Sequence, residues 1–304
     1  MSAPLIAVPP LTIIDARLVS TNVPETDYGV YNPATTYALG ARVILTTGVH
    51  LVYESVQASN LGKDPALATS ATWWKKVGAT NAWRCLDTKV STQTVQAGGM
   101  SYRFTPGKVV SVVYLGNVQA DSVRVRMIDP VAGTVYDKTT SLLGSVRRAR
   151  PYDWYFSRRV RKTRFLALNL PAYYGADILV DVVAAGDAAV GVLMLGYPQA
   201  LGRDVKLGVR VGIDDYSRKI RNDYGDDELV QLAFADRAEF DLVVDNSEID
   251  SLKDQLTDLR ATPCLWIGSS LYACTIVFGW YSNFEILIPY NVVSDCNLSL
   301  KGLT

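Results

Sequence analysis

Side chains that carry acid–base or nucleophilic chemistry are scarce in this chain of 304 residues, and its single histidine is His50. Most hydrolytic schemes need a histidine base beside a hydroxyl or thiol nucleophile. His50 follows residues 46–49, a Thr-Thr-Gly-Val run that predicts a hairpin. We therefore expect His50 to be a surface hairpin residue and not half of a buried catalytic pair.

Neighbouring carboxylates are the other candidates for catalysis, and they occur as Asp214 with Asp215 and as Asp226 with Asp227. A glycosidase needs two carboxyl groups that face each other across a cleft, whereas neighbours on a strand point to opposite faces. The Asp- and Gly-rich run 223–227 lacks the ligand spacing of a calcium-binding EF-hand loop, which favours a solvated turn. Glycine-rich loops that cradle phosphates or dinucleotides are also missing from the sequence. We expect no catalytic residues, no metal site, no cofactor and no enzymatic activity.

The cysteines give no sign of a redox or zinc site. The chain has four, at Cys85, Cys264, Cys274 and Cys296, and no two of them have C-x-x-C spacing. Free cysteines of this kind are usually buried, so we expect buried, reduced thiols.

Overall charge is balanced, with 30 Lys and Arg against 30 Asp and Glu. A balanced charge gives no general attraction to nucleic acid or to an anionic membrane, so we expect neither partner. No apolar run approaches the roughly 20 residues that span a bilayer. Residues 1–10 lack a basic stretch and contain three prolines, which is not typical of a signal peptide. We expect synthesis and assembly in a cytoplasm.

Turn signals divide the chain into four segments, all dominated by predicted strands. The chain has 17 tyrosines, and its wealth of Val, Thr and Tyr favours β-structure. We expect a mainly β fold made of an N-terminal arm and strand (1–27), a small β-module (28–87), a jelly-roll-like β-sandwich (88–202) and an α+β domain with one helix (203–304). Because its prolines deny it ladder hydrogen bonds, 1–10 is predicted to be an extended, polyproline-like arm, followed by a strand at 11–20.

The predicted elements of the last two segments follow period-2 and helical patterns. Seven strands are predicted in the sandwich, at 100–105, 109–116, 122–129, 133–140, 163–170, 177–184 and 189–196. In the last segment strands are predicted at 205–213, 228–235, 237–244, 264–267, 272–280, 283–289 and 293–301. A helix is predicted at 246–260, because Ile249, Leu252, Leu256 and Leu259 share one face. Asp245 and Glu248 have the spacing of a capping box at its start.

The module at 28–87 concentrates aromatic residues and holds three of the six tryptophans. Trp73 and Trp74 are adjacent, and neighbours on a strand point to opposite faces, so one of them should be exposed. An exposed tryptophan usually has a partner.

The order of residues in this segment, Y-x-x-G-x-x-V from Tyr37, a tyrosine at 53, G-x-x-P and then W-W, resembles the small chitin- and cellulose-binding modules of secreted glycosidases. One departure is Ala41, where that family commonly has an acidic residue. The resemblance implies a glycan-binding or docking surface made of Tyr37, Tyr53, Trp73 and Trp74. The alternative is that these rings pack against the rest of the chain or a neighbouring subunit.

The strongest charge cluster lies in the middle of the chain, where basic side chains are interleaved with aromatic ones. Such a cluster fits single-stranded nucleic acid or lipopolysaccharide phosphate, and it also fits a protein interface, where Arg and Trp are enriched. Since the whole chain is neutral, we favour a subunit interface. Its members are Arg147, Arg148, Arg150, Trp154, Arg158, Arg159 and Arg161.

Three further stretches carry a second resemblance. Residues 80–94 are similar to a segment of bacteriophage tail and baseplate proteins that contain the same small module, and residues 240–267 and 296–303 resemble the ring-forming domains of distal tail and baseplate proteins. This resemblance implies a structural, non-enzymatic component of a phage tail tip or baseplate, located in the virion. Its partners would be copies of itself, in a cyclic homo-oligomer, and other tail proteins.

Two other functions and the presence of an iron–sulfur cluster stay open as alternatives. The first is a glycan-binding adhesin that recognises a host surface sugar through residues 28–80, and the second is a polysaccharide-degrading enzyme. Some phage tail-tip proteins also carry an iron–sulfur cluster in their C-terminal region. Here such a cluster would need Cys85 in addition to the three C-terminal cysteines.

Overall fold

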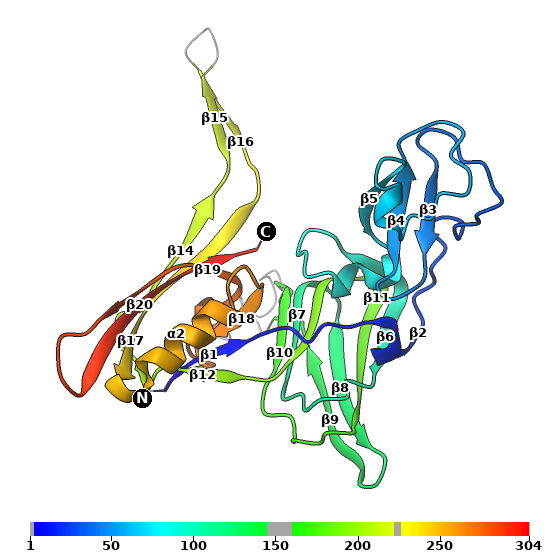
Figure 1. Cartoon of the computed structure of the whole chain (residues 1–304). Coiled ribbons are helices and arrows are strands. Elements are labelled where there is room, and N and C mark those ends of the chain that lie inside the picture. Colours follow the sequence, from blue (N-terminus) through cyan, green and yellow to red (C-terminus); the bar gives the residue numbers. More distant parts are fainter. Residues whose placement is uncertain (1–2, 145–159, 222–225, 304) are drawn as a thin grey trace, which may run out of the picture. The chain divides into compact units, whose positions relative to one another are not determined.

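The computed structural model describes residues 3–144, 160–221 and 226–303, which form a mainly β protein (Figure 1). The chain divides into two compact units. Unit 1 combines residues 1–10 with 196–304, and unit 2 consists of residues 11–195. Each unit has a hydrophobic core of its own. In the part of the chain that is described, no helix is long and apolar enough to cross a membrane.

Unit 1 is built on an eight-stranded antiparallel sheet. The strand order is β12-β1-β18-β19-β20-β17-β13, and β14 also pairs with β17. The strands are β1 (Leu5–Val8), β12 (Gln199–Leu201), β13 (Asp204–Val205), β14 (Arg210–Asp215), β17 (Phe234–Asp245), β18 (Cys264–Ile267), β19 (Ile276–Leu287) and β20 (Val293–Gly302).

Residues 5–8 form a strand inside this sheet, so the prediction of a polyproline-like arm without ladder bonds is wrong there. In β1, Leu5 lies opposite Leu201 of β12, and Ile6 lies opposite Ile267 of β18. Leu5, Ala7 and Val8 are buried in the structure. The three prolines stand at 4, 9 and 10, outside the strand, where they delimit it without removing a ladder hydrogen bond.

The predicted helix is confirmed, with a different start. A 3-10 turn (Asn246–Glu248) leads into α2 (Ile249–Asp258), which lies along one face of the unit 1 sheet (Figure 1). Leu252, Leu256 and Leu259 on the predicted apolar face are buried in the core of unit 1. The capping box does not form, because the extra turn separates Asp245 from α2. The Asp245 carboxylate lies 3.3 Å from Arg203 instead.

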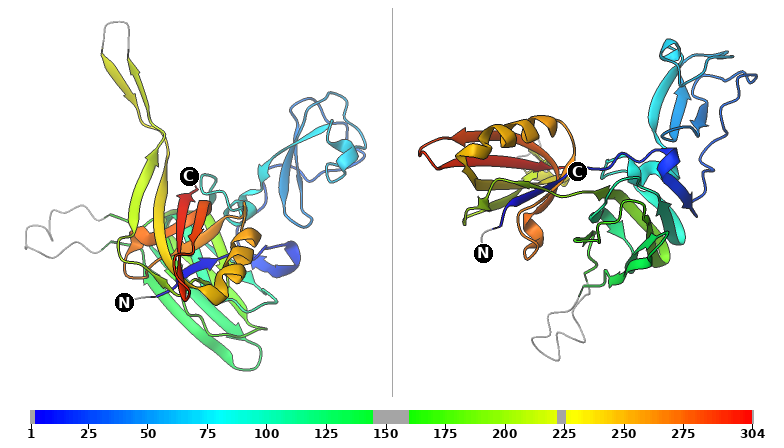
Figure 2. Two further views of the ribbon diagram at one scale, coloured as in Figure 1. Left: turned by 60° about the vertical axis from the view of Figure 1, so that its left-hand side comes forward. Right: turned by 60° about the horizontal axis from the view of Figure 1, so that its bottom comes forward.

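A thin β-ribbon continues from the β14–β17 pair. Its strands β15 (Arg218–Arg221) and β16 (Asp227–Val230) make a separate two-stranded sheet. The ribbon stands clear of the unit 1 sheet in Figure 1 and in the left view of Figure 2. The predicted strand at 228–235 therefore covers the end of β16 and the beginning of β17.

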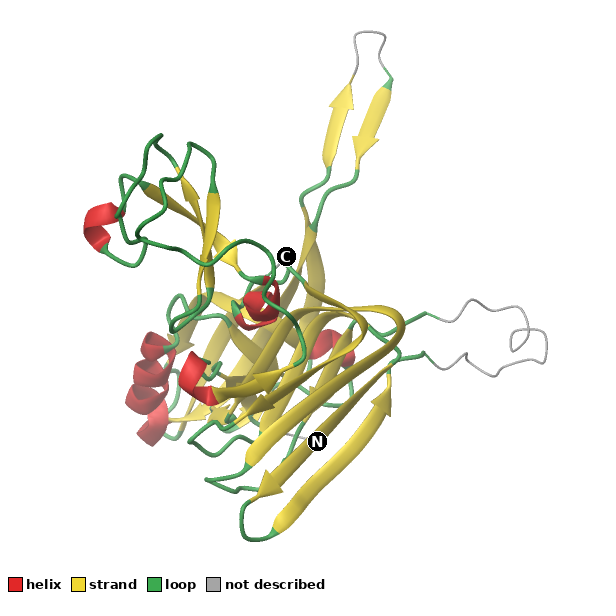
Figure 3. Cartoon of the chain, turned by 90° about the vertical axis from the view of Figure 1, so that its right-hand side faces the viewer, coloured by secondary structure: helices red, strands yellow, loops and turns green. Residues whose placement is uncertain are grey.

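Unit 2 contains a seven-stranded antiparallel sheet. Its order is β10-β7-β11-β6-β2, with β8 pairing to β11 and β9 pairing to β8. The seven strands predicted as a sandwich correspond to the six strands β6 to β11, which belong with β2 to one hydrogen-bonded sheet. Figure 3 shows the strands of the chain in yellow. The strands are β2 (Leu18–Thr21), β6 (Thr94–Phe104), β7 (Val112–Gln119), β8 (Ser122–Asp129), β9 (Gly133–Ser141), β10 (Arg164–Ala167) and β11 (Asp177–Gly196).

Strand β11 joins two predicted strands, 177–184 and 189–196, into one element of 20 residues. The prediction left a break at 185–188, but pairing with β6 continues past it after a register shift between Val183 and Asp187. Such a shift is a β-bulge, which bends a strand without ending it. Beyond the bulge every residue from 188 to 196 is buried, as expected for a strand covered on both faces.

The module at 28–80 is a three-stranded antiparallel sheet of β3 (Arg42–Leu45), β4 (Leu51–Ser55) and β5 (Trp74–Ala79). It leads into the 3-10 helix η3 (Asn81–Leu86), whose Ala82, Trp83 and Cys85 belong to the core of unit 2. The hydroxyl of Tyr102 on β6 donates to the carbonyl of Ala82 at 2.8 Å. Residues 81–86 therefore anchor the module to the large sheet. The remaining short 3-10 turns are η1 (Asp15–Arg17), η2 (Ala68–Ser70) and η5 (Ala273–Thr275).

Candidate functional site

Two of the four aromatic residues singled out in the module form its internal cluster. Trp74 is only 4% exposed, and its ring lies edge-on to Tyr37 and Tyr31, with centroids 5.3 Å and 6.0 Å away. Its indole Nε1 donates to the carbonyl of Lys63 at 2.7 Å. Because a sheet this small has few other apolar side chains to bury, Trp74 and Tyr37 hold the module together and leave little surface for a ligand.

Trp73 is the accessible member of the tryptophan pair, but it lies in the turn just before β5, so its exposure does not come from the alternation of side chains on a strand. It is partly exposed, and the Lys63 Nζ lies 5.6 Å from its ring centroid, a cation–π distance. Tyr53 is half-buried, and burial raises its pKa, with the negative charge of Asp64 adding to the effect. Of the four predicted residues, Trp73 is therefore the best placed to contact a partner.

His50 lies in the hairpin between β3 and β4, as expected, but its side chain is largely covered, so the expectation of a surface residue is wrong. Its side chain is 12% exposed, and its Nδ1 lies 2.7 Å and 2.8 Å from the two carboxylate oxygens of Glu25. Its Nε2 lies 3.4 Å from a carboxylate oxygen of Asp15. The imidazole also packs on the indole of Trp83, with centroids 4.6 Å apart.

These contacts fix the orientation of the imidazole but place no nucleophile beside it. An ionised carboxylate only accepts hydrogen bonds, so Nδ1 is the nitrogen that donates a hydrogen bond to Glu25. In the described residues the charged groups next to both ring nitrogens are carboxylates, where a nucleophilic mechanism would need a hydroxyl or thiol. Glu25 and Asp15 come from segments outside the aromatic module, and no periodicity in the sequence linked them to His50.

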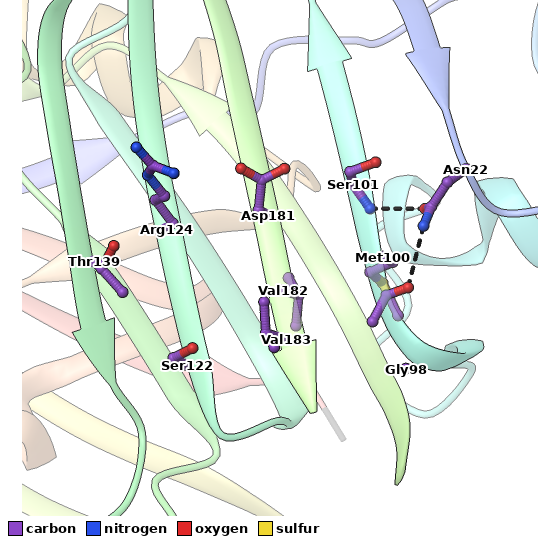
Figure 4. Close-up of a pocket in the computed structure, with 11 residues that line it drawn as sticks. Asn22, Gly98, Met100, Ser101, Ser122, Arg124, Thr139, Asp181, Val182 and Val183 are labelled. Atoms are coloured by element: carbon purple, nitrogen blue, oxygen red, sulfur yellow. Dashed lines mark hydrogen bonds between the residues drawn. The ribbon is translucent and has the colours of Figure 1, made fainter. Parts of the chain in front are cut away.

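The exposed face of the unit 2 sheet carries an open groove of about 410 Å³, lined by both polar and apolar residues. Figure 4 shows Ser101, Ser122, Thr139, Arg124 and Asp181 on neighbouring strands along it. The two charged side chains are already paired within the sheet: Arg124 makes two hydrogen bonds to Asp137, and Asp181 accepts one from Arg126 at 2.8 Å. The Arg124 guanidinium also holds the pKa of Asp137 below its usual value.

Backbone geometry at one end of this groove is unusual. Asn22 bridges the edge of β6: its Oδ1 accepts from the backbone N–H of Ser101 at 2.8 Å, and its Nδ2 donates to the carbonyl of Gly99 at 3.2 Å (Figure 4). Gly99 has φ +127°, and a Cβ there would lie 2.5 Å from the carbonyl oxygen of Val182. Gly98 and Gly99 thus give β6 a left-handed backbone at this end of the groove, where β6 passes close to β11. The groups that line the groove are those of a solvated sheet face.

Most of the predicted arginine cluster lies outside the described residues, including Arg147, Arg148, Arg150, Trp154, Arg158 and Arg159. Arg161 is described, and its guanidinium pairs with Asp121 at 2.9 Å. This contact gives Arg161 a role within unit 2.

Within the described residues, Asp214 and Asp215 are each held by other groups of the chain, and the cysteines do not form a metal-binding group. Asp214 lies 3.9 Å from Arg237 and 3.7 Å from Lys301, while the Asp215 carboxylate accepts hydrogen bonds from Ser217. Cys85, Cys264 and Cys296 are buried, and Cys274 is exposed. Among the residues that the structure describes, no three His, Cys, Asp or Glu side chains are grouped so that they could hold a metal ion.

Two exposed apolar surfaces in unit 1 were missed at the level of sequence. The first is the turn between β19 and β20, here called the tip, where Leu287 is 62%, Ile288 62%, Tyr290 69% and Val292 72% exposed. The tip has a defined shape, because Asn246 at the start of the helical segment donates from its Nδ2 to the Tyr290 carbonyl at 2.7 Å and from its backbone N–H to the Val292 carbonyl at 3.0 Å.

The second surface is one face of the β14–β17 pair, here called the arm. Residues directly opposite each other in a ladder share a face, and β14 and β17 pair Val211 with Ala238 and Asp215 with Phe234. Ala238 is fully buried in the core, whereas Val211, Ile213 and Phe234 on the same face are exposed. This face of unit 1 therefore continues from the core into solvent, where the carboxylates of Asp236, opposite Ile213, and Asp215, opposite Phe234, stand between its apolar side chains.

The arm and the tip lie at opposite ends of unit 1. Strands β17 and β20 pair from Arg237 opposite Lys301, near the arm, to Asp245 opposite Val293, next to the tip. Runs such as residues 286–292, rich in apolar side chains around a proline, could have flagged the tip in the sequence. The arm could not be found in this way, because its apolar and polar residues alternate as they do in any half-buried strand.

No family model matches the chain, and no curated protein matches it at a significant level.

Proposed function

We propose that this chain is a non-enzymatic structural component of a bacteriophage tail tip or baseplate, which forms an oligomeric ring and docks neighbouring tail proteins. The observation that carries the proposal is the pair of apolar surfaces at opposite ends of the unit 1 sheet, the arm and the tip. Large side chains exposed in contiguous patches mark protein contacts. Two patches at opposite ends provide two different contacts, one for a ring neighbour and one for the next protein of a tail.

The arm is the surface that we assign to the ring neighbour. It is continuous with the hydrophobic core and is formed by regular, paired strands, so it offers a rigid face to a second copy. In a ring of identical chains, such a face on each copy contacts a different surface of the next copy. The jelly-roll-like character of residues 88–202, the glycan-module character of residues 28–87 and the ring-forming character of residues 203–304 are part of the same proposal. The first rests on the spacing of the predicted strands, and the other two rest on the sequence resemblances described above.

The tip is the surface that we assign to another tail protein. Its backbone is fixed by Asn246, so little conformational entropy is lost when Tyr290 and its neighbours are covered. Aromatic and aliphatic anchors at the centre of a contact carry most of its binding energy.

The proposal is tested with the purified full-length chain by light scattering and by electron microscopy of stained particles. We expect closed particles of several copies, and co-purification with the tail proteins encoded beside it. The variant Ile288→Ser, Tyr290→Ser, Val292→Ser should lose the co-purifying proteins and keep the ring. A chain that stays monomeric at all concentrations and binds none of the co-expressed tail proteins contradicts the proposal.

A second candidate function is glycan binding through residues 28–80, and Trp73 is the observation in its favour. Its partly exposed ring, with Lys63 beside it, has the shape of a stacking platform for a sugar. Glycan arrays test it. Binding by the wild type that is lost in Trp73→Ala supports an adhesin, and the absence of any binding by the wild type removes this candidate.

A further inference from the structure

The ribbon of β15 and β16 has little to hold it in water by itself. In the described residues, neither strand has a second strand neighbour, and the two make a sheet of their own. All four residues of β15 are exposed, as are Asp227, Glu228 and Leu229 of β16. An isolated two-stranded ribbon is marginally stable at best. The ribbon therefore gains from any partner that covers its edges or faces.

The base of the ribbon is nevertheless well defined. The Asp215 carboxylate accepts hydrogen bonds from the backbone N–H of Ser217 at 2.9 Å and from its hydroxyl at 2.6 Å. The Ser217 hydroxyl in turn accepts from the backbone N–H of Leu232 at 3.1 Å. These bonds connect the segment before β15 to the segment after β16 where the ribbon leaves the arm. They hold β15 and β16 in a fixed register.

Charge on the ribbon is separated by strand. Strand β15 carries Arg218, Lys219 and Arg221, whereas β16 carries Asp227 and Glu228. Within the ribbon the two strands attract each other, and Arg221 lies directly opposite Asp227. The ribbon thus has one basic outer edge and one acidic outer edge.

These edges favour one way of pairing two ribbons. Like charges on directly opposite residues destabilise a sheet, and opposite charges stabilise it. Contact of β15 with β15, or of β16 with β16, brings like charges together. Contact of β15 with β16 of another ribbon repeats the charge pattern that already exists within each ribbon. The directions agree as well: when two ribbons point the same way, β15 of one and β16 of the next run antiparallel, as they do within one ribbon.

Both faces of the ribbon also carry an apolar side chain. This favours a role in contact with a partner over a role in keeping the strand edges soluble. Residues opposite in the ladder share a face, so Lys219 and Leu229 lie on one face, and Ile220 and Glu228 lie on the other. Leu229 is 70% exposed and Ile220 48% exposed. A ribbon that served only to repel other edges would carry charge without these apolar groups. A neighbouring ribbon would cover part of both.

We propose that the ribbon is an assembly element that pairs edge to edge with the ribbon of a second copy of this chain, basic β15 against acidic β16. Because each ribbon has one edge of each kind, the contact is heterologous and repeats from copy to copy until a ring closes. The proposal rests on the ring formation proposed above and names the contact that gives the ring its direction. A copy of the chain is the occupant because each edge finds its complement on the other edge of the same ribbon.

Charge reversal on one strand at a time tests this pairing. The variant Arg218→Glu, Lys219→Glu has two acidic edges, and the variant Asp227→Lys, Glu228→Lys has two basic edges. Each variant alone should associate about tenfold or more weakly than the wild type in analytical ultracentrifugation. An equal mixture of the two variants should recover the assembly, because their edges complement each other. Circular dichroism shows whether each variant keeps its fold.

The matched control is Lys253→Glu, Arg260→Glu, which reverses two exposed charges in and just after α2 and should assemble like the wild type. If both ribbon variants assemble as well as the control, the ribbon contact is wrong while the ring proposal stands. Variants that fail alone and also fail when mixed equally contradict the pairing. A wild type that is monomeric throughout overturns the ring itself, and the ribbon proposal with it.

Discussion

The imidazole of His50 packs against the indole of Trp83, with ring centroids 4.6 Å apart. His50 belongs to the aromatic module, immediately before β4, whereas Trp83 belongs to the core of the large sheet of unit 2. Glu25 holds the same imidazole by its Nδ1. This contact joins the three-stranded sheet of the module to the core of the large sheet, and it uses the one histidine of the chain for structure.

Replacing His50 with alanine should therefore loosen the module. The change removes the stacking contact and leaves the partly buried Glu25 carboxylate without its donor, which costs about 1 kcal/mol of unfolding free energy. Urea unfolding of His50→Ala, beside the exposed control Lys75→Ala, measures the loss. His50→Ala and Glu25→Gln should also be non-additive when combined, since they remove one shared contact. Additive effects of the two substitutions would contradict the coupling.

Separate substitution of the two adjacent tryptophans should have opposite consequences. Trp74→Ala empties the internal cluster with Tyr37 and Tyr31, and such a loss typically costs about 3–5 kcal/mol. Trp73→Ala should leave the fold unchanged within about 0.5 kcal/mol, the range usual for surface positions. Thermal unfolding followed by near-ultraviolet circular dichroism distinguishes the two. Equal destabilisation by both variants would show that Trp73 is also a core residue.

Local patterns were enough to predict much of the secondary structure. Strand β8 was predicted to the residue at 122–129, and the buried face of α2 followed from the spacing of Leu252, Leu256 and Leu259. Both depend on side chains close in sequence. Two long strands were split in the prediction, because their bulges contain residues that also favour turns. Strand β19 continues from Ile276 to Leu287 through a register shift between Tyr281 and Asn283.

Features that depend on distant partners could not be predicted. The burial of His50 needs Glu25 and Asp15, and the burial of Trp74 needs Tyr31 and Tyr37. The sequence pointed to the aromatic residues of the module but not to which of them face inward. Strand β1 is the same case, because its two neighbours β12 and β18 lie almost 200 residues or more along the chain.

A charge placed on β1 should destabilise unit 1 in particular. Leu5 is fully buried between β12 and β18. Leu5→Asp should therefore cost about 3 kcal/mol or more, since an unpaired carboxylate is buried. Hydrogen exchange measured by mass spectrometry should show faster exchange across unit 1 and unchanged exchange in unit 2. The control Ile14→Asp, at an exposed position outside β1, should have little effect. Unchanged exchange in β18 of the Leu5→Asp variant would contradict the pairing of β1.

Alanine at position 99 should disturb the bend of β6. A Cβ there would lie 2.5 Å from the Val182 carbonyl oxygen, at a φ of +127° that L-residues rarely adopt. Gly99→Ala should cost about 2 kcal/mol in denaturant unfolding. Gly29→Ala is the matched control, because nothing lies within 4 Å of the position its Cβ would take and its φ is not positive. Equal stability of the two variants would show that β6 can relax without cost.

The cysteines should differ sharply in their reactivity. Burial raises the pKa of Cys85 to about 11, that of Cys264 to about 12 and that of Cys296 to about 11. At pH 8 the reactive thiolate then makes up about one part in a thousand or less of each group. Cys274 is exposed. Iodoacetamide at pH 8 should therefore label one site in the native chain, as intact mass spectrometry would show, and none in Cys274→Ser.

The same burial predicts how stability changes in alkali. In the unfolded chain a thiol has a pKa of about 8.5, so the folded state favours the protonated form of the three buried thiols. Their contribution is complete below about pH 8.5 and is lost as the pH rises towards the folded values near 11 and 12. Unfolding free energy should therefore fall over that range, and the fall should be smaller in Cys85→Ala. Rapid labelling of two or more cysteines in the native state at pH 8 would contradict the burial of these thiols.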